Sequence, residues 1–118
     1  MQYLLLIYSA ESLDPKPGSE EFGPLMNDYY KFTQEVKERG ILEAGQPLEN
    51  VSTATTVRVR NGKTQIVDGP FAETKEVLGG YYLLNCENLD EALECAAKIP
   101  TAKYGSIEVR PIMILPRD

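Results

Sequence analysis

Two short segments of the chain, residues 3–8 and 81–86, are apolar at both alternating positions rather than at every second one. This pattern predicts strands that are covered on both faces. Each segment is followed by a helical pattern and then by a further strand, at residues 41–45 and 107–115, with a hairpin between the two units. That order predicts an α+β fold of the split βαβ, or ferredoxin-like, kind with an inserted β-hairpin. A chain of 118 residues is expected to form one domain over residues 1–118.

The helices are predicted from apolar side chains that recur on one face at spacings of three and four residues. The first helix is expected over about residues 20–39, with its buried face formed by Leu25, Tyr29, Phe32 and Val36. Gly40 is expected to end it in a left-handed conformation. The second helix is expected to follow Asn88, with Glu91 completing a capping box, and to end at Pro100. Its apolar face is expected to comprise Leu89, Ala92, Leu93, Ala96 and Ile99.

The hairpin is predicted from Asn61-Gly62, which separates two runs rich in β-branched residues. A two-residue type I′ turn needs positive φ at both positions, which Asn and Gly tolerate. The turn fixes the register, so that Arg60 pairs with Lys63. Side chains on one face are then Val57, Val59 and Ile66, and those on the other are Arg58, Arg60, Lys63 and Gln65.

A sheet with both helices on one side leaves its other face open. We expect a second copy of the same sheet to cover that face, which gives a homodimeric α+β barrel with a cavity near the interface. The chain carries 12 basic and 18 acidic side chains, a net charge of −6, which disfavours nucleic acid as a partner. No apolar run approaches the roughly 20 residues that span a bilayer, and the N-terminal segment lacks the features of a signal peptide. A cytoplasmic protein is therefore expected, with no membrane partner.

The chain contains no histidine, which excludes His-ligated metal sites, Ser-His triads and histidine general bases. Cys86 and Cys95 are the only cysteines, too few for a structural zinc site. We interpret both as buried or half-buried free thiols. No cofactor and no metal are expected.

Residues 68–76 read DGPFAETKE and are followed by LGGYY at residues 78–82. Together with residues 3–8, 53–63 and 106–111, this segment closely resembles the DGPF subgroup of the YCII-related proteins, from Met1 to about Met113. The resemblance implies a ferredoxin-like fold and a dimeric α+β barrel. It implies no settled activity: the broader group is proposed to be enzymatic through a His–Asp pair, and this chain has no histidine to supply. The association of DGPF domains with extracytoplasmic-function sigma factors implies a regulatory role by analogy.

Asp68 is the candidate catalytic residue. In one interpretation it closes an Asx turn, with Gly69 and Pro70 setting the backbone and Phe71 plugging the sheet edge. In the other it lies at the mouth of a cavity as a carboxylate base, where burial raises its proton affinity.

The candidate binding residues are Arg58, Lys75, Tyr81, Glu108 and Arg110. Glu108 and Arg110 are two apart on a strand, so both project to one face, either as an internal ion pair or with Arg110 holding a carboxylate. Lys75 belongs to a solvated loop or contacts an anionic substrate. Tyr81 is a core residue or shares the cavity, and Arg58 is a solvated edge charge or part of a basic rim.

The leading hypothesis is a dimeric barrel that binds a small polar or anionic organic molecule. As an enzyme it would carry out cofactor-free proton transfer, in an isomerisation, elimination or dehydrohalogenation, with Asp68 as base and Arg110 with Lys75 as anion clamp. The alternative is a non-catalytic module, either a ligand sensor or a partner of a sigma factor or other transcription regulator. A third possibility is a purely structural dimer without a cavity.

Overall fold

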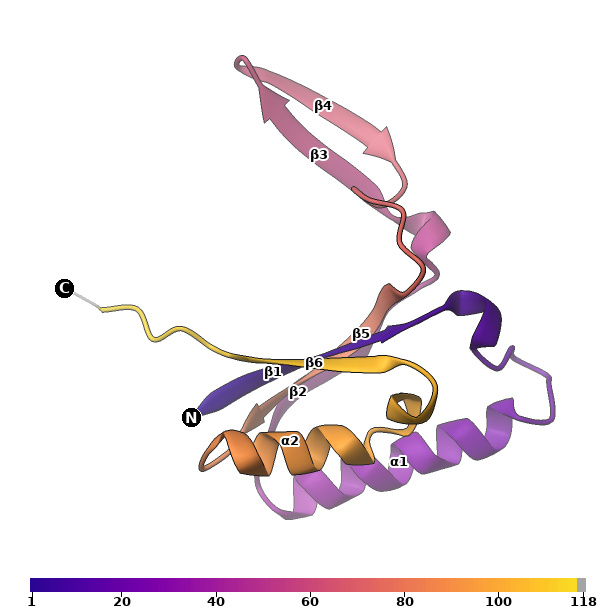
Figure 1. Cartoon of the computed structure of the whole chain (residues 1–118), viewed down its shortest axis with the longest axis vertical. Helices are drawn as coiled ribbons and strands as arrows, with labels where there is room; N and C mark the ends of the chain where they lie inside the picture. Colours follow the sequence, from indigo (N-terminus) through magenta and orange to yellow (C-terminus); the bar gives the residue numbers. More distant parts are fainter. Residues whose placement is uncertain (117–118) are drawn as a thin grey trace.

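The computed structural model describes residues 1–116 and contains a four-stranded sheet with two helices on one side (Figure 1). The strands are β1 (Gln2–Ser9), β2 (Leu42–Pro47), β5 (Val77–Asn85) and β6 (Ser106–Pro111), and the helices are α1 (Phe22–Glu38) and α2 (Leu89–Lys98). Short 3-10 turns lie at η1 (Glu11–Leu13), η2 (Val51–Thr53) and η3 (Pro100–Lys103). The strand order is β2-β5-β1-β6, and all neighbours are antiparallel. The predicted ferredoxin-like arrangement is confirmed.

The hydrophobic core lies between the helices and one face of the sheet. Alternate side chains of β1 and β5 point into it and are buried, namely Tyr3, Leu5, Ile7, Tyr82 and Leu84. The intervening side chains, among them Leu4, Leu6, Tyr81 and Leu83, point to the other face and are only half-buried. Within one chain, the expectation that residues 3–8 and 81–86 are covered on both faces is therefore not met. We call this second side the open face.

The helix ends follow the predicted signals, but one helix face differs. Gly40 has a φ of 73°, and the Asn88 side chain accepts a hydrogen bond from the Glu91 amide at 2.9 Å. The side chains of α2 that are buried are Ala92, Cys95 and Ala96, whereas Leu89 and Leu93 are each 47% exposed. The predicted apolar face was wrong for these two leucines, because small side chains let the helix lie close to the sheet.

The last strand is shorter than predicted and ends at Pro111 instead of residue 115. The reason is its partner: Pro111 lies opposite Tyr3, and the Ile112 amide bonds to the carbonyl of Gln2, where β1 begins. Beyond this point β6 has no neighbouring backbone with which to pair.

The hairpin is formed by β3 (Thr55–Arg60) and β4 (Lys63–Asp68), with the predicted register. Asn61 and Gly62 have φ angles of 53° and 73°, as a type I′ turn requires. The hairpin is a separate two-stranded sheet that extends away from the four-stranded sheet, on the side opposite the helices (Figure 1). Its predicted apolar face lies uncovered.

No helix in the described part of the chain is long and apolar enough to cross a membrane.

Candidate functional site

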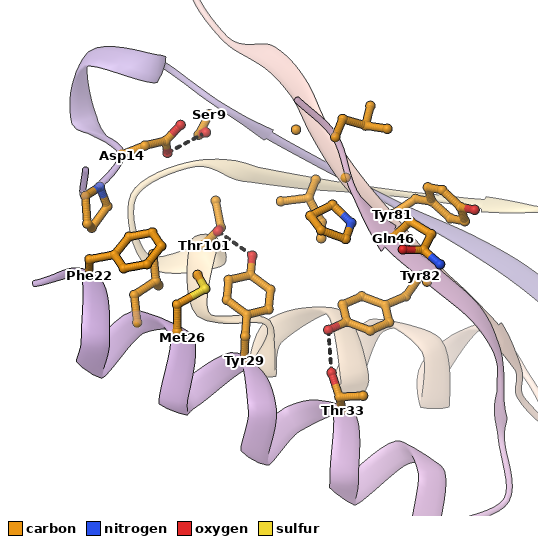
Figure 2. A pocket seen from close by; sticks show the side chains of 18 of the residues that line it. Ser9, Asp14, Phe22, Met26, Tyr29, Thr33, Gln46, Tyr81, Tyr82 and Thr101 are labelled. Atoms are coloured by element: carbon orange, nitrogen blue, oxygen red, sulfur yellow. Dashed lines mark hydrogen bonds between the residues drawn. The ribbon is translucent and has the colours of Figure 1, made fainter. Parts of the chain in front are cut away.

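A cavity of about 480 Å³ lies between the first turns of α1 and the helix-facing side of the sheet (Figure 2). The loop after β1 and the end of β2 complete its walls. Most of its surface is apolar and comes from Pro15, Phe22, Leu25, Met26, Pro47 and Leu48. A volume of this size is typical of sites for small organic molecules.

Glycines create the space below α1. Gly45 and Gly80 lie in β2 and β5 and line the cavity, where other residues would place side chains. A Cβ at Gly45 would lie 2.8 Å from Cδ1 of Tyr82, and one at Gly80 would lie 3.0 Å from the carbonyl oxygen of Gln46. A side chain at Gly45 would therefore clash with the Tyr82 ring, and one at Gly80 would crowd the backbone of β2.

Two hydroxyl pairs supply polar groups in the cavity. The Tyr29 hydroxyl is hydrogen-bonded to Oγ1 of Thr101, and the Tyr82 hydroxyl lies 2.7 Å from Oγ1 of Thr33 (Figure 2). The Tyr82–Thr33 pair holds two hydroxyl hydrogens and uses one of them internally, so one hydrogen is available to a ligand. The Thr101 side chain is also in hydrogen-bonding contact with the Tyr104 hydroxyl, which lines the same cavity. Burial raises the pKa of Tyr29 to about 12 and also raises the pKa of Tyr82. Both phenols are therefore neutral donors at pH 7.

Asp14 lies in the loop after β1, at the end of the cavity away from Tyr82 (Figure 2). Its carboxylate accepts a hydrogen bond of 2.8 Å from Oγ of Ser9. Among the described residues that line the cavity, Asp14 carries the only formal charge, and no lysine or arginine is present there. The cavity is thus suited to an uncharged ligand with a hydrogen to donate, and it disfavours an anion.

The loop that carries Asp14 is fastened by further hydrogen bonds. The carboxylate of Glu11 accepts a hydrogen bond from the Val51 amide at 2.9 Å, which ties the loop to η2. The Lys16 ammonium donates to the carbonyl of Glu11 at 2.7 Å. These contacts hold the rim of the cavity in place and connect it to the start of the hairpin.

Of the residues predicted from sequence, only Tyr81 borders this cavity. Its backbone lies opposite Leu6, and its ring lies at the edge of the site, away from Tyr29 (Figure 2). Glu108 is also opposite Leu6, and Arg110 is opposite Leu4, so both lie on the open face, where they are exposed. The three ion pairs among residues 1–116 do not include Glu108 or Arg110.

Arg58, Asp68 and Lys75 are exposed and do not line the cavity. Within one chain, Asp68 is at the end of β4 and Phe71 is 77% exposed, so neither the buried carboxylate nor the plugged sheet edge is present. Gly69 has a φ of 102°, as the turn interpretation requires.

Side chains of β3 bind the backbone of residues 68–71, which we call the DGPF turn. The Thr56 hydroxyl donates to the carbonyl of Gly69 at 2.8 Å, and the Arg58 guanidinium donates to the carbonyl of Phe71 at 3.4 Å. The turn is therefore attached to the hairpin.

Sequence reasoning missed Asp14, Thr33 and Thr101 as site residues and assigned Tyr29 to the core. Two signals point toward this site. The connection between β1 and α1 is unusually long, which indicates a mobile or functional loop. Adjacent glycines, Gly79 and Gly80, interrupt an otherwise bulky strand, which indicates a close approach or a vacant space.

The cysteines and acidic side chains form no metal or thiolate site among the residues that the structure describes. No group of three or more Cys, Asp or Glu side chains is arranged to hold a metal ion in residues 1–116. Cys86 and Cys95 are free and buried, as predicted, and burial raises the pKa of the Cys86 thiol to about 11. A neutral, inaccessible thiol is a poor nucleophile.

Residues 1–115 match the family described as the YCII-related domain. The chain belongs to the YCII-related family. An uncharacterised protein of Rhizobium meliloti (strain 1021) is 40% identical over 116 residues, covering 97% of this chain and 94% of that protein.

Among solved structures, the chain is similar to 5-chloro-2-hydroxyhydroquinone dehydrochlorinase (TftG) from Burkholderia phenoliruptrix AC1100, in complex with 2,5-dihydroxybenzoquinone. The TM-score is 0.53 at 15% identity, over 96% of this chain and 94% of that one. At this identity the similarity establishes a shared fold.

Proposed function

We propose that this YCII-related protein binds a small, uncharged, ring-containing molecule in the α1 cavity and moves a proton on it without a cofactor. The observation that carries the proposal is the arrangement of Asp14 at one end of an apolar cavity, with the neutral hydroxyls of Tyr29 and Tyr82 on other walls. The apolar walls and aromatic rings favour a flat ligand. The lone carboxylate favours a ligand that donates a hydrogen.

In the proposed reaction Asp14 accepts a proton from the ligand, and a phenol hydroxyl donates a hydrogen bond to the ligand oxygen on which negative charge develops. Return of the proton to another ligand atom completes an isomerisation, and departure of a leaving group completes an elimination. The similarity in fold to a dehydrochlorinase supports small-molecule chemistry of this type. No lysine or arginine among residues 1–116 lines the cavity, which favours an uncharged polar ligand over an anionic one.

The test uses resorcinol and hydroquinone as probes and follows ring-proton exchange with D₂O by NMR. We expect the wild-type protein to bind them and to accelerate exchange, and Asp14→Asn to bind them with exchange lowered about 100-fold or more. Asp28→Asn is the matched control, because Asp28 is an exposed carboxylate of α1 outside this cavity.

The outcomes separate the two functional classes. Binding without exchange in the wild type contradicts the catalytic proposal and supports a ligand sensor. Absence of binding of either probe contradicts the proposed site. Equal loss in Asp14→Asn and Asp28→Asn contradicts the role of Asp14.

We also propose that the protein is a homodimer whose copies meet at the open face. The half-buried side chains of Leu4, Leu6 and Leu83 support this, since an apolar sheet face needs a cover. Tyr81, Glu108 and Arg110 would then lie between the copies. Roles for Arg58, Asp68 and Lys75 stay predictions that depend on this assembly.

A further inference from the structure

The hairpin of residues 55–68, which we call the arm, is not stabilised by packing against its own chain. Val57, Val59 and Ile66 share one face, and they are 60%, 59% and 69% exposed. A lone two-stranded hairpin is at best marginally stable in water. Three adjacent exposed aliphatic side chains on such a hairpin indicate a contact surface.

The shape of the molecule leads to the same conclusion. Its extents are 50 × 48 × 18 Å, and its radius of gyration is 16.5 Å. A compact chain of this length has a radius of gyration of about 13–14 Å. The difference reflects an arm that extends from the body on the side of the open face (Figure 1).

The distribution of charge indicates which surface the arm contacts. The arm, residues 55–68, contains Arg58, Arg60 and Lys63 and one acidic side chain, Asp68, a net charge of +2. The remainder of the chain has nine basic and 17 acidic side chains, a net charge of −8. The arm is therefore attracted to the body of another copy of the same chain.

We propose that the arm of each copy lies against the open face of a second copy, with Val57, Val59 and Ile66 on the apolar side chains of β1 and β5. The proposal rests on the homodimer proposed above and adds which element forms the contact. The open face is chosen because it combines Leu4, Leu6 and Leu83, half-buried and without a cover, in one surface. The apolar face of the arm of one copy and the open face of the other copy thus cover each other.

Docking of the arm also changes the surroundings of Asp68. Asp68 pairs with Thr55, so its side chain shares the face of Val57 and Ile66. The DGPF turn is attached to the arm through the hydrogen bonds of Thr56 and Arg58. The second copy therefore buries the Asp68 carboxylate, which is exposed in one chain, and the site around it is incomplete without that copy.

The first test compares Ile66→Lys with Gln65→Lys by sedimentation velocity. The two residues are neighbours on opposite faces of the arm, and both substitutions add one positive charge. We expect the wild type and Gln65→Lys to be dimers and Ile66→Lys to be a monomer at micromolar concentration. Both variants should keep the folded four-stranded sheet and should still bind resorcinol, because neither residue contacts the cavity.

The outcomes separate this proposal from the previous ones. A monomeric wild type contradicts both the homodimer and the arm contact. A dimer in all three proteins contradicts the arm contact and leaves the homodimer standing. Loss of the dimer in both variants also contradicts it, because the face of the arm then has no effect.

The second test locates the contact. Val59→p-benzoylphenylalanine places a photo-crosslinker on the apolar face, and mass spectrometry identifies the peptide to which it couples. We expect cross-links between copies to residues 2–9 or 77–85. Cross-links to α1 or α2, or none between copies, contradict the proposed geometry.

Discussion

Two hydroxyl hydrogen bonds determine both the position of α1 and the chemistry of the cavity. Tyr29 and Thr33 are one helical turn apart on the same face of α1, and they reach different elements. Tyr29 bonds to Thr101 in η3, and Thr33 bonds to Tyr82 in β5. The ring of Tyr82 also packs edge-on against Phe32, with centroids 5.0 Å apart. The same contacts that fix the helix therefore orient the donors offered to a ligand.

The raised pKa of Tyr29 predicts a loss of stability at alkaline pH. Its pKa is 10.0 in the unfolded chain and about 12 in the folded protein, because burial disfavours the phenolate. The contribution to stability is complete below about pH 10 and is lost as the pH rises through about 12. We expect urea midpoints to fall between about pH 10 and pH 12, and to fall less in Tyr29→Phe. The same fall in both proteins would contradict this assignment.

At the residue scale, the sequence predicted which side of a strand a residue faces better than which residues form a site. Glu108 and Arg110 lie on one face, away from the helices, as their alternation with Ile107 and Val109 predicted. The face to which a strand residue points follows from its position in the alternation, which can be read directly from the sequence. Asp14 lines the cavity because of the conformation of a long loop. That conformation depends on contacts with Ser9 and η2, which no periodic pattern in the sequence encodes.

At the element scale, boundaries were predicted where a specific residue type enforces them. Asn61 and Gly62 set the hairpin register, and Gly40 ends α1, because few other residues tolerate positive φ. The buried face of α2 was less predictable. Leu89 and Leu93 are on the expected stripe, but Cys95 occupies the core position, and a close helix–sheet contact selects small side chains over large ones.

The N-terminus of α2 gives a prediction for a single element. The side chain of Asn88 accepts a hydrogen bond from the Glu91 amide, and the Glu91 carboxylate accepts one from the Glu87 amide at 2.8 Å. We expect Asn88→Ala to lower the free energy of unfolding by about 1 kcal/mol in urea titrations, because an amide loses its partner. Asn88→Asp should retain most of the stability. Equal stability of all three proteins would show that the cap does not contribute.

At the scale of the whole molecule, the chain divides into an acidic body and a basic arm. The body contains the core and the cavity, whereas the arm adds little to either. The order of elements along the sequence predicted the body, because two strand–helix–strand units permit few topologies. The direction in which the arm leaves the body could not be predicted, since it depends on the irregular segments at residues 48–54 and 69–76.

The opposite charges of arm and body predict that the proposed dimer is sensitive to salt. We expect the dissociation constant to rise severalfold between about 0.05 M and about 0.5 M NaCl, because ions screen exposed charges. The double variant Arg58→Gln, Arg60→Gln should form a weaker dimer with a smaller dependence on salt. Sedimentation equilibrium measures both effects. A dissociation constant that stays constant or falls with salt in the wild type would contradict an electrostatic contribution.

The hydrogen bond from the Val51 amide to the Glu11 carboxylate has a thermodynamic consequence. It joins the rim that carries Asp14 to the backbone from which β3 starts four residues later. A ligand that displaces the rim therefore also shifts the base of the arm. In the proposed dimer, ligand occupancy and self-association are then linked, and by reciprocity each alters the affinity of the other by the same factor.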